Sequence, residues 1–127
     1  MDNTFGTGGA TVTSLGQEFP YSAALAVTVQ ANGEIIMGGF AGSKGSNPYA
    51  PPPFSIALAR YTSSGTLDHT FGSNGVVITL ITDASYDWIS GLAIQSDGKI
   101  LAIANLGAVN KERASVAGGL ALRYLAQ

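Results

Sequence analysis

An eight-residue motif occurs twice in the chain and sets its organisation. Residues 2–9 read D-N-T-F-G-T-G-G and residues 68–75 read D-H-T-F-G-S-N-G, so five of the eight letters are identical. The two copies lie 66 positions apart. A repeat of this length indicates supersecondary units that bury their apolar faces against one another.

Two further landmarks extend the repeat over nearly the whole chain. Q-A-N-G-E at residues 30–34 matches Q-S-D-G-K at residues 95–99, and R-Y at residues 60–61 matches R-Y at residues 123–124. The offset shrinks from 66 to 65 and then to 63, so residues are lost only between the landmarks. Loops change length in this way on a fixed framework. We therefore divide the chain into two units, residues 1–66 and 67–127.

Each unit is predicted to contain four strands and no helix. The expected strands are residues 10–15, 23–29, 34–40 and 54–61, then 76–81, 88–95, 99–106 and 118–125. Asn32-Gly33 and Asp97-Gly98 are expected to form type I′ hairpin turns, in which both central residues have positive φ. The segments 16–22, 42–53, 82–87 and 107–116 are predicted to be loops.

The composition of the predicted strands favours sheets that are covered on both faces. The strands are almost continuously apolar, as in A-L-A-V-T-V and I-L-A-I-A. Four-stranded sheets that stack face to face around an axis are the blades of a β-propeller. The predicted fold class is therefore all-β, with two four-stranded antiparallel meander blades of a β-propeller. The alternative is a β-sandwich in which each of two sheets hides one face.

The three landmarks, in this order, resemble a known repeat. D-x-T-F-G-x-x-G, then Q-x-D-G-K-I, then A-L-R-Y is similar to the delta-60 repeat, a propeller-like repeat that occurs in tandem in bacterial surface or secreted proteins and in some phage proteins. The resemblance covers both units. It implies a β-propeller-type scaffold, no shared catalytic activity, and an extracellular or virion-associated location. Asn32 and Glu34 depart from the aspartate and lysine of the repeat, and two copies are fewer than a ring requires.

Composition narrows the classes of function. Charged residues make up 11% of the chain, against roughly 25% in an average globular domain, so much of the surface is expected to be covered by other chains or made of small neutral residues. A net charge of −2 gives no basic footprint for nucleic acid. No apolar run reaches the ~18 residues of a membrane span, and the N-terminus does not read as a signal peptide. The absence of cysteine excludes disulfides and thiolate metal sites.

The repeated residues are interpreted as structural. The motif aspartates are expected to bond nearby backbone amides, the phenylalanines to fill the space between blades, and the glycines to supply positive φ. Arg60 precedes the second motif closely, so it is expected to bond the aspartate of that turn, and Arg123 holds the matching place in the second unit. The predicted structural residues are Asp2, Phe5, Gly6, Gly9, Arg60, Asp68, Phe71, Gly72, Gly75 and Arg123.

No catalytic or metal-binding pattern stands out. His69 is the single histidine and is interpreted as a solvated turn residue, since a zinc site needs further ligands. Asp83 and Asp87 offer carboxylate oxygens but lack the spacing of a calcium loop. A serine-histidine-aspartate set is not suggested, and nothing points to a glycosidase pair. We expect that the protein is not an enzyme and that it binds neither a cofactor nor a metal.

Aromatic residues gather on one predicted rim. Connections in a meander alternate between its ends, so the long loops share one rim and the hairpin turns share the other. Aromatic side chains on long loops are common in binding surfaces. The candidate partner-binding rim consists of Phe19, Tyr21, Tyr49, Tyr86, Asp87, Trp88 and Arg113. The alternative is that these residues cap the ends of the blades.

The predicted function is a non-enzymatic structural or binding module that assembles with itself through blade–blade contacts. Two blades leave two apolar faces bare, which favours a ring of several copies, with a trimer of six blades ahead of a tetramer of eight. Residue 127 of one copy followed by residue 1 of the next would nearly recreate the connection at residues 60–71. The alternatives are a lectin-like propeller that binds glycans, a hydrolase whose site is shared between chains, and a monomeric sandwich. Besides further copies of the chain, the candidate partners are a protein or a glycan ligand.

Overall fold

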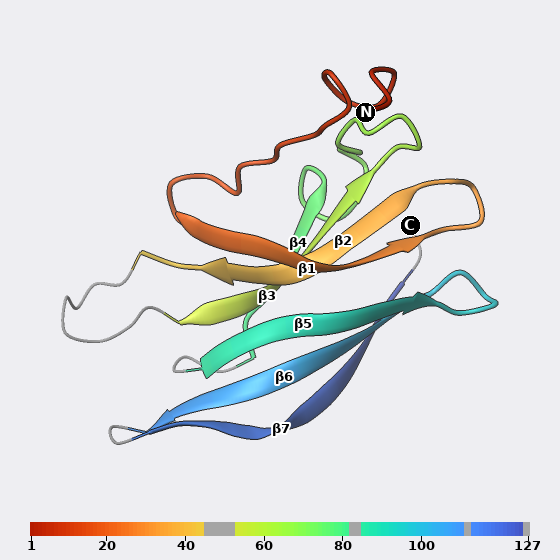
Figure 1. The fold of residues 1–127 in the computed structure, drawn as a ribbon. Coiled ribbons are helices and arrows are strands. Elements are labelled where there is room, and N and C mark those ends of the chain that lie inside the picture. Colours follow the sequence, from red (N-terminus) through yellow and green to blue (C-terminus); the bar gives the residue numbers. More distant parts are fainter. Residues whose placement is uncertain (45–52, 82–84, 111–112, 126–127) are drawn as a thin grey trace.

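The chain folds into seven β-strands (Figure 1). The computed structural model describes residues 1–44, 53–81, 85–110 and 113–125. Within these ranges there is no helix, and therefore none that is long and apolar enough to span a membrane. The strands are β1 (Tyr21–Val29), β2 (Ile35–Gly42), β3 (Phe54–Tyr61), β4 (Val76–Thr79), β5 (Ser85–Ile94), β6 (Ile100–Asn110) and β7 (Arg113–Tyr124).

The strands form two antiparallel meanders. In the first sheet β1, β2, β3 and β4 are successive neighbours, and in the second β5, β6 and β7 are successive neighbours. A single parallel pair, Phe54 with Tyr86, links β3 to β5 at one rim. The all-β class and the absence of helix in the described residues are as predicted.

The first sheet takes its fourth strand from the second unit. β4 pairs with β3 from Ala59↔Val76 to Ile56↔Thr79. Residues 10–13 are the counterparts of β4 in the first unit, yet residues 11–16 are not in a strand. The predicted strand at residues 10–15 is therefore wrong. A strand needs a neighbouring edge to satisfy its backbone groups, and β4 already occupies the free edge of β3.

Three predicted loops are also shorter than expected. β1 begins at Tyr21, β5 begins at Ser85, and the β6–β7 ladder continues through Ala108↔Ser115 to Asn110↔Arg113. Backbone hydrogen bonds carry the pairing beyond the apolar runs, because main-chain groups of any residue can join a ladder. A bulge between Leu106 and Gly107 absorbs the change in register.

The hairpin turns lie where they were predicted but are not of type I′. Gly33 has a φ of 87° and Gly98 a φ of 83°, whereas neither Asn32 nor Asp97 has a positive φ. The bonds Gln30 N to Glu34 O (2.8 Å) and Gly33 N to Gln30 O (2.9 Å) instead close a three-residue loop. Such a loop combines a type I turn with one left-handed glycine.

The core lies between the two sheets. Ile36, Ile56 and Leu58 of the first sheet pack against Ile89, Ile100, Ala102 and Ala104 of the second. We call the side of the first sheet that carries Ile36, Ile56, Leu58 and Arg60 its forward face, and the side of the second sheet that carries Ile89, Ile100, Ala102 and Ala104 its backward face. Because the two units repeat, counterpart residues define a forward face and a backward face on each sheet. The forward face of the second sheet carries Leu101, Ile103, Ala121 and Arg123, and the backward face of the first carries Val27, Val29, Met37, Ala59 and Tyr61.

Candidate functional site

The second copy of the repeated motif closes around a buried arginine. Arg60 is 2% exposed, and its Nε and Nη2 atoms each lie 2.7 Å from Oδ2 of Asp68. Its guanidinium carbon lies 4.8 Å from the centre of the Phe71 ring, and Nη1 lies 3.4 Å from Glu34 Oε2. The cation is thus paired with two carboxylates and stacked on an aromatic ring, which offsets the cost of burying it.

The turn that presents Asp68 is built by its own side chain. Oδ1 of Asp68 accepts bonds from the backbone N of Thr70 (3.0 Å) and from its hydroxyl (2.6 Å). These two bonds, with the Arg60 guanidinium adding to them, hold the pKa of Asp68 below its usual value of 3.8. Gly72, Asn74 and Gly75 have φ values of 54°, 55° and 97°, so the turn needs residues that tolerate left-handed backbone.

The first copy of the motif has the same shape but no arginine. Oδ1 of Asp2 accepts bonds from the Thr4 backbone N (2.9 Å) and hydroxyl (2.6 Å), as Asp68 does from Thr70. These bonds lower the pKa of Asp2, with no contribution from an arginine. Phe5 is half-buried, whereas its counterpart Phe71 is 2% exposed.

The arginine that the first motif lacks has its counterpart at the other end of the molecule. Arg123 occupies in β7 the place that Arg60 occupies in β3, but its side chain is exposed. No ion pair or hydrogen bond involves the Arg123 side chain in the part of the chain that the structure describes. The molecule therefore contains one complete arginine site and the two separate halves of another.

Counterpart residues on the faces of the two sheets also differ in burial, as the two arginines do. On the backward face, Leu92 and Ile94 pack against the core, whereas their counterparts Val27 and Val29 are 63% and 57% exposed. On the forward face, Ile36 is fully buried and its counterpart Leu101 is half-buried. Ile103 on the same face is 54% exposed. Each of the two faces is thus buried in one sheet and partly exposed in the other.

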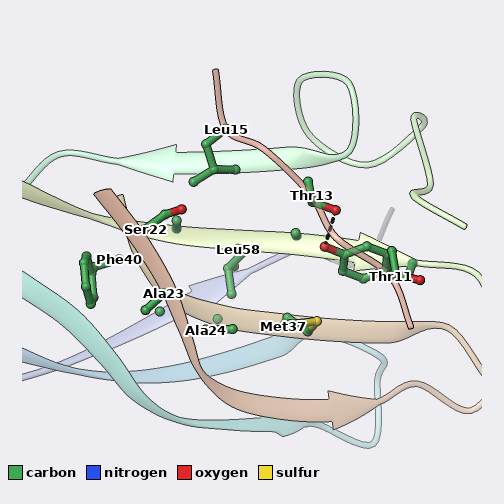
Figure 2. Close-up of a pocket in the computed structure, with 14 residues that line it drawn as sticks. Thr11, Thr13, Leu15, Ser22, Ala23, Ala24, Met37, Phe40 and Leu58 are labelled. Atoms are coloured by element: carbon green, nitrogen blue, oxygen red, sulfur yellow. Dashed lines mark hydrogen bonds between the residues drawn. The ribbon is translucent and has the colours of Figure 1, made fainter. Parts of the chain in front are cut away.

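A shallow cavity of about 180 Å³ lies where residues 11–15 cross the backward face of the first sheet (Figure 2). Met37, Ala59 and Tyr61 line it from the sheet, and Thr11, Thr13 and Leu15 line it from the N-terminal segment. The Tyr61 hydroxyl donates a hydrogen bond of 2.7 Å to Thr13 Oγ1. This cavity is therefore a gap between a sheet face and a segment that is not part of the sheet.

Among the described residues, the predicted rim residues differ in their exposure and do not all lie on the surface. Tyr21 is 58% exposed, but Phe19 and Trp88 are half-buried. Asp87 is fully buried inside β5, so its predicted place on an exposed loop is wrong. The cause is the early start of β5, which carries Asp87 into the sheet. Tyr49 lies outside the described residues, as do the side chains of Tyr86 and Arg113.

An aromatic pair that sequence reasoning missed lies at this rim. Phe40 and Phe54 stack with ring centres 4.6 Å apart and an angle of 10° between the ring planes. Their positions near the facing ends of β2 and β3 were the signal, because residues diagonal to one another across a hairpin are within reach of aromatic rings.

The polar groups of the described residues do not form a metal centre. No group of three or more histidine, cysteine, aspartate or glutamate side chains gathers among them. His69 is exposed, and its Nδ1 lies 2.7 Å from Oδ1 of Asn74 within the repeated motif. Asp83 lies outside the described residues.

Comparison with known families finds one match at the junction between the two units. Residues 53–71 match a family model described as a domain of unknown function (DUF5122) beta-propeller. This stretch contains β3, Arg60, Asp68 and Phe71. The match supports a β-propeller-type repeat. It does not single out the delta-60 repeat, and comparison with curated proteins and with solved structures found no match.

Proposed function

We propose that the chain is a non-enzymatic structural module of β-propeller type, whose copies assemble head to tail through the forward and backward faces. The observation that carries the proposal is that each face is buried in one sheet and partly exposed in the other. Val27 and Val29 are exposed, whereas their counterparts Leu92 and Ile94 pack against the core. Ile103 is likewise exposed, whereas its counterpart Gly38 is buried. On the forward face of the second sheet, Leu101 and Arg123 occupy the places that the buried Ile36 and Arg60 occupy on the forward face of the first.

Hydrophobic burial would drive such an assembly. Complete burial of a valine, leucine or isoleucine side chain contributes about 1.5–3 kcal/mol. Val27, Val29 and Ile103 are each more than half exposed, so much of this contribution is still available to them. The low charge, 11% of residues, fits a molecule whose surface is covered by its neighbours.

The contact is heterologous, because the forward face of one copy packs against the backward face of its neighbour. Heterologous contacts close into a ring when the rotation per copy divides a full turn. Propellers have about four to eight blades, so three copies would give six blades and four copies would give eight. We favour the trimer. The resemblance to repeats of bacterial surface and phage proteins supports a structural role in an extracellular or virion-associated assembly.

Mass measurement tests the proposal. Light scattering on the purified 127-residue chain should give the mass of three copies, or of four. Val27→Lys and Ile103→Lys each place a charge in the contact, so both variants should shift the mass to that of one copy while the far-ultraviolet spectrum keeps its β signature.

Ser96→Lys is the matched control. It adds the same charge on the exposed hairpin between β5 and β6, away from both faces, and should leave the mass of the assembly unchanged. A monomeric mass for the unmodified chain at all accessible concentrations would contradict the proposal. The lectin-like and hydrolase alternatives are favoured by no specific feature of the described residues.

A further inference from the structure

We infer that residues 10–13 of one copy add as a fourth strand to the free edge of β7 in the next copy, and that Asp2 of the first copy pairs with Arg123 of the second. The inference rests on the proposed head-to-tail assembly and specifies how the neighbouring copies are joined. It commits to one occupant for the β7 edge, a second copy of this chain.

The junction between the two units within the molecule is the precedent. β4 immediately follows the second motif and pairs with the edge of β3, so each motif is followed by a strand that belongs to the preceding sheet. The second sheet ends at β7, which pairs only with β6 among the described residues. β7 therefore presents the row of unpaired backbone groups that β3 presents to β4, and such an edge readily accepts an added strand.

The N-terminal segment is already positioned for this role. Thr13 accepts a 2.7 Å hydrogen bond from the Tyr61 hydroxyl, and its counterpart Thr79 makes a 2.9 Å bond with the hydroxyl of Tyr124. Leu15 lies over the backward face of the first sheet, as its counterpart Ile81 packs against the core at the second. The segment thus lies against the following sheet as β4 does, and lacks only the preceding sheet with which β4 pairs.

The backbone of residues 10–13 is in a state compatible with this pairing. Ala10 exchanges two backbone bonds with Thr7, as Val76 at the start of β4 does with Ser73. Residues 11–16 belong to no strand, and Val12 is 94% exposed, whereas its counterpart Ile78 in β4 is 37% exposed. Transferring the β3–β4 register by the repeat offsets predicts four pairs between copies. They are Thr13↔Gly119, Val12↔Leu120, Thr11↔Ala121 and Ala10↔Leu122.

The same transfer unites the two halves of the arginine site. Arg60 bonds Asp68, the backbone N of Arg60 bonds Gly75 O (3.1 Å), and the backbone N of Asp68 bonds Arg60 O (2.9 Å). Their counterparts are Arg123, Gly9 and Asp2. The first motif has the shape of the second, with matching bonds from Gly9 N to Phe5 O (2.9 Å) and from Gly75 N to Phe71 O (2.8 Å). It therefore presents Asp2 to an incoming Arg123 as Asp68 is presented to Arg60.

Engineered disulfides test the register directly, because the chain has no cysteine of its own. The Arg60–Gly75 pair is hydrogen-bonded, so by strict alternation Ala57↔Ile78 is a non-hydrogen-bonded pair, in which the side chains come closest. Its counterpart between copies is Leu120↔Val12. The variant Val12→Cys/Leu120→Cys should therefore give disulfide-linked dimers and larger multimers on a non-reducing gel.

Two double variants serve as controls. Ala57→Cys/Ile78→Cys should form a disulfide within one chain, which establishes that this kind of pair oxidises. Val12→Cys/Ala121→Cys places the second thiol on the opposite face of β7 and should give no link. If Val12→Cys/Leu120→Cys forms no disulfide while the first control does, or forms one only within a single chain, the strand addition between copies is wrong.

Removal of the arginine tests the ion pair. Arg123→Met should raise the dissociation constant of the assembly by about 30-fold or more, as expected when one partner of a buried charge pair is lost, and should leave the melting of the dilute single copy unchanged. Arg60→Met is the contrast, because it should lower the melting of the single copy itself. An unchanged dissociation constant for Arg123→Met would overturn the pairing of Arg123 with Asp2.

The mass measurement separates this inference from the proposed function. A monomeric mass would contradict both the proposed head-to-tail assembly and the strand addition. An assembly of three or four copies without the Val12–Leu120 link removes the strand addition and leaves the face-to-face contact standing.

Discussion

The buried arginine site shows how single residues set the junction between the two units. Phe71 is 2% exposed, lies under the Arg60 guanidinium and belongs to the hydrophobic core. Phe5, at the same place in the first motif, is only half-buried and its ring lies against Gly65. The two copies of the motif thus place the same residue, between a threonine and a glycine in both, at different degrees of burial.

This difference predicts unequal costs for the same substitution. Phe71→Ala should lower the free energy of unfolding by about 3–5 kcal/mol, because it removes a fully buried ring. Phe5→Ala should cost distinctly less at a protein concentration where the chain is dissociated. Urea denaturation of both variants measures the two costs, and equal values would show that the burial of Phe71 does not matter.

The lowered pKa of Asp68 predicts an acid-dependent stability. Its bonds to Thr70 and Arg60 favour the carboxylate in the folded protein, so the stability that it contributes is present above pH 3.8 and is lost as the pH falls toward the lowered value. Asp68→Asn should therefore weaken the protein at neutral pH and flatten the acid limb of its stability curve.

Asp2→Asn is the matched variant for this measurement. Asp2 makes the same two threonine bonds without an arginine, so its substitution should have the smaller effect on a dissociated copy. Thermal melting from pH 2.5 to 7 compares the two, and an acid limb unchanged by Asp68→Asn would contradict the assignment.

At the scale of elements, one glycine determines each hairpin. Gly33 has a φ of 87°, and a side chain there would meet the Ser63 Cβ at 3.3 Å. Gly33→Ala should therefore destabilise the protein by about 1–2 kcal/mol, the cost of a left-handed conformation for an L-residue.

Gly91→Ala provides the control for that substitution. Gly91 lies in β5, has no left-handed φ, and has no atom within 4 Å of the position that a Cβ would take. Its substitution should change stability by no more than a few tenths of a kcal/mol. If urea denaturation gives the two glycines the same cost, the hairpin conformation is not what Gly33 contributes.

The whole molecule leaves one forward face and one backward face partly exposed, which predicts that its stability depends on protein concentration. Association favours the folded state by mass action, so the melting temperature should fall when the chain is diluted. Val27→Lys should melt at the same temperature at all concentrations, because it is already dissociated. Calorimetry over a hundredfold dilution series measures the effect, and a constant melting temperature for the unmodified chain would argue for a stable single copy.

The sequence by itself determined the local features of this protein. The repeat, the positions of both hairpins, the apolar strands and the motif glycines all follow from short stretches whose preferences do not depend on distant partners. Gly72 and Gly75 need left-handed backbone wherever the motif occurs, and Phe71 follows a turn that Asp68 builds with its own side chain. These features could be predicted because their causes lie within a few residues.

Only the tertiary structure decided which repeated segments became strands and which faces became core. Residues 10–13 and Val76–Thr79 follow the same motif, yet only the second segment finds a sheet edge, that of β3. Val27 and Leu92 are likewise counterparts, but only Leu92 meets another sheet. Asp87 became buried because pairing with β6 carries β5 past its apolar run. Strand pairing and face burial are contacts between segments far apart in the chain, so two nearly identical local sequences reach different states when only one of them has a partner.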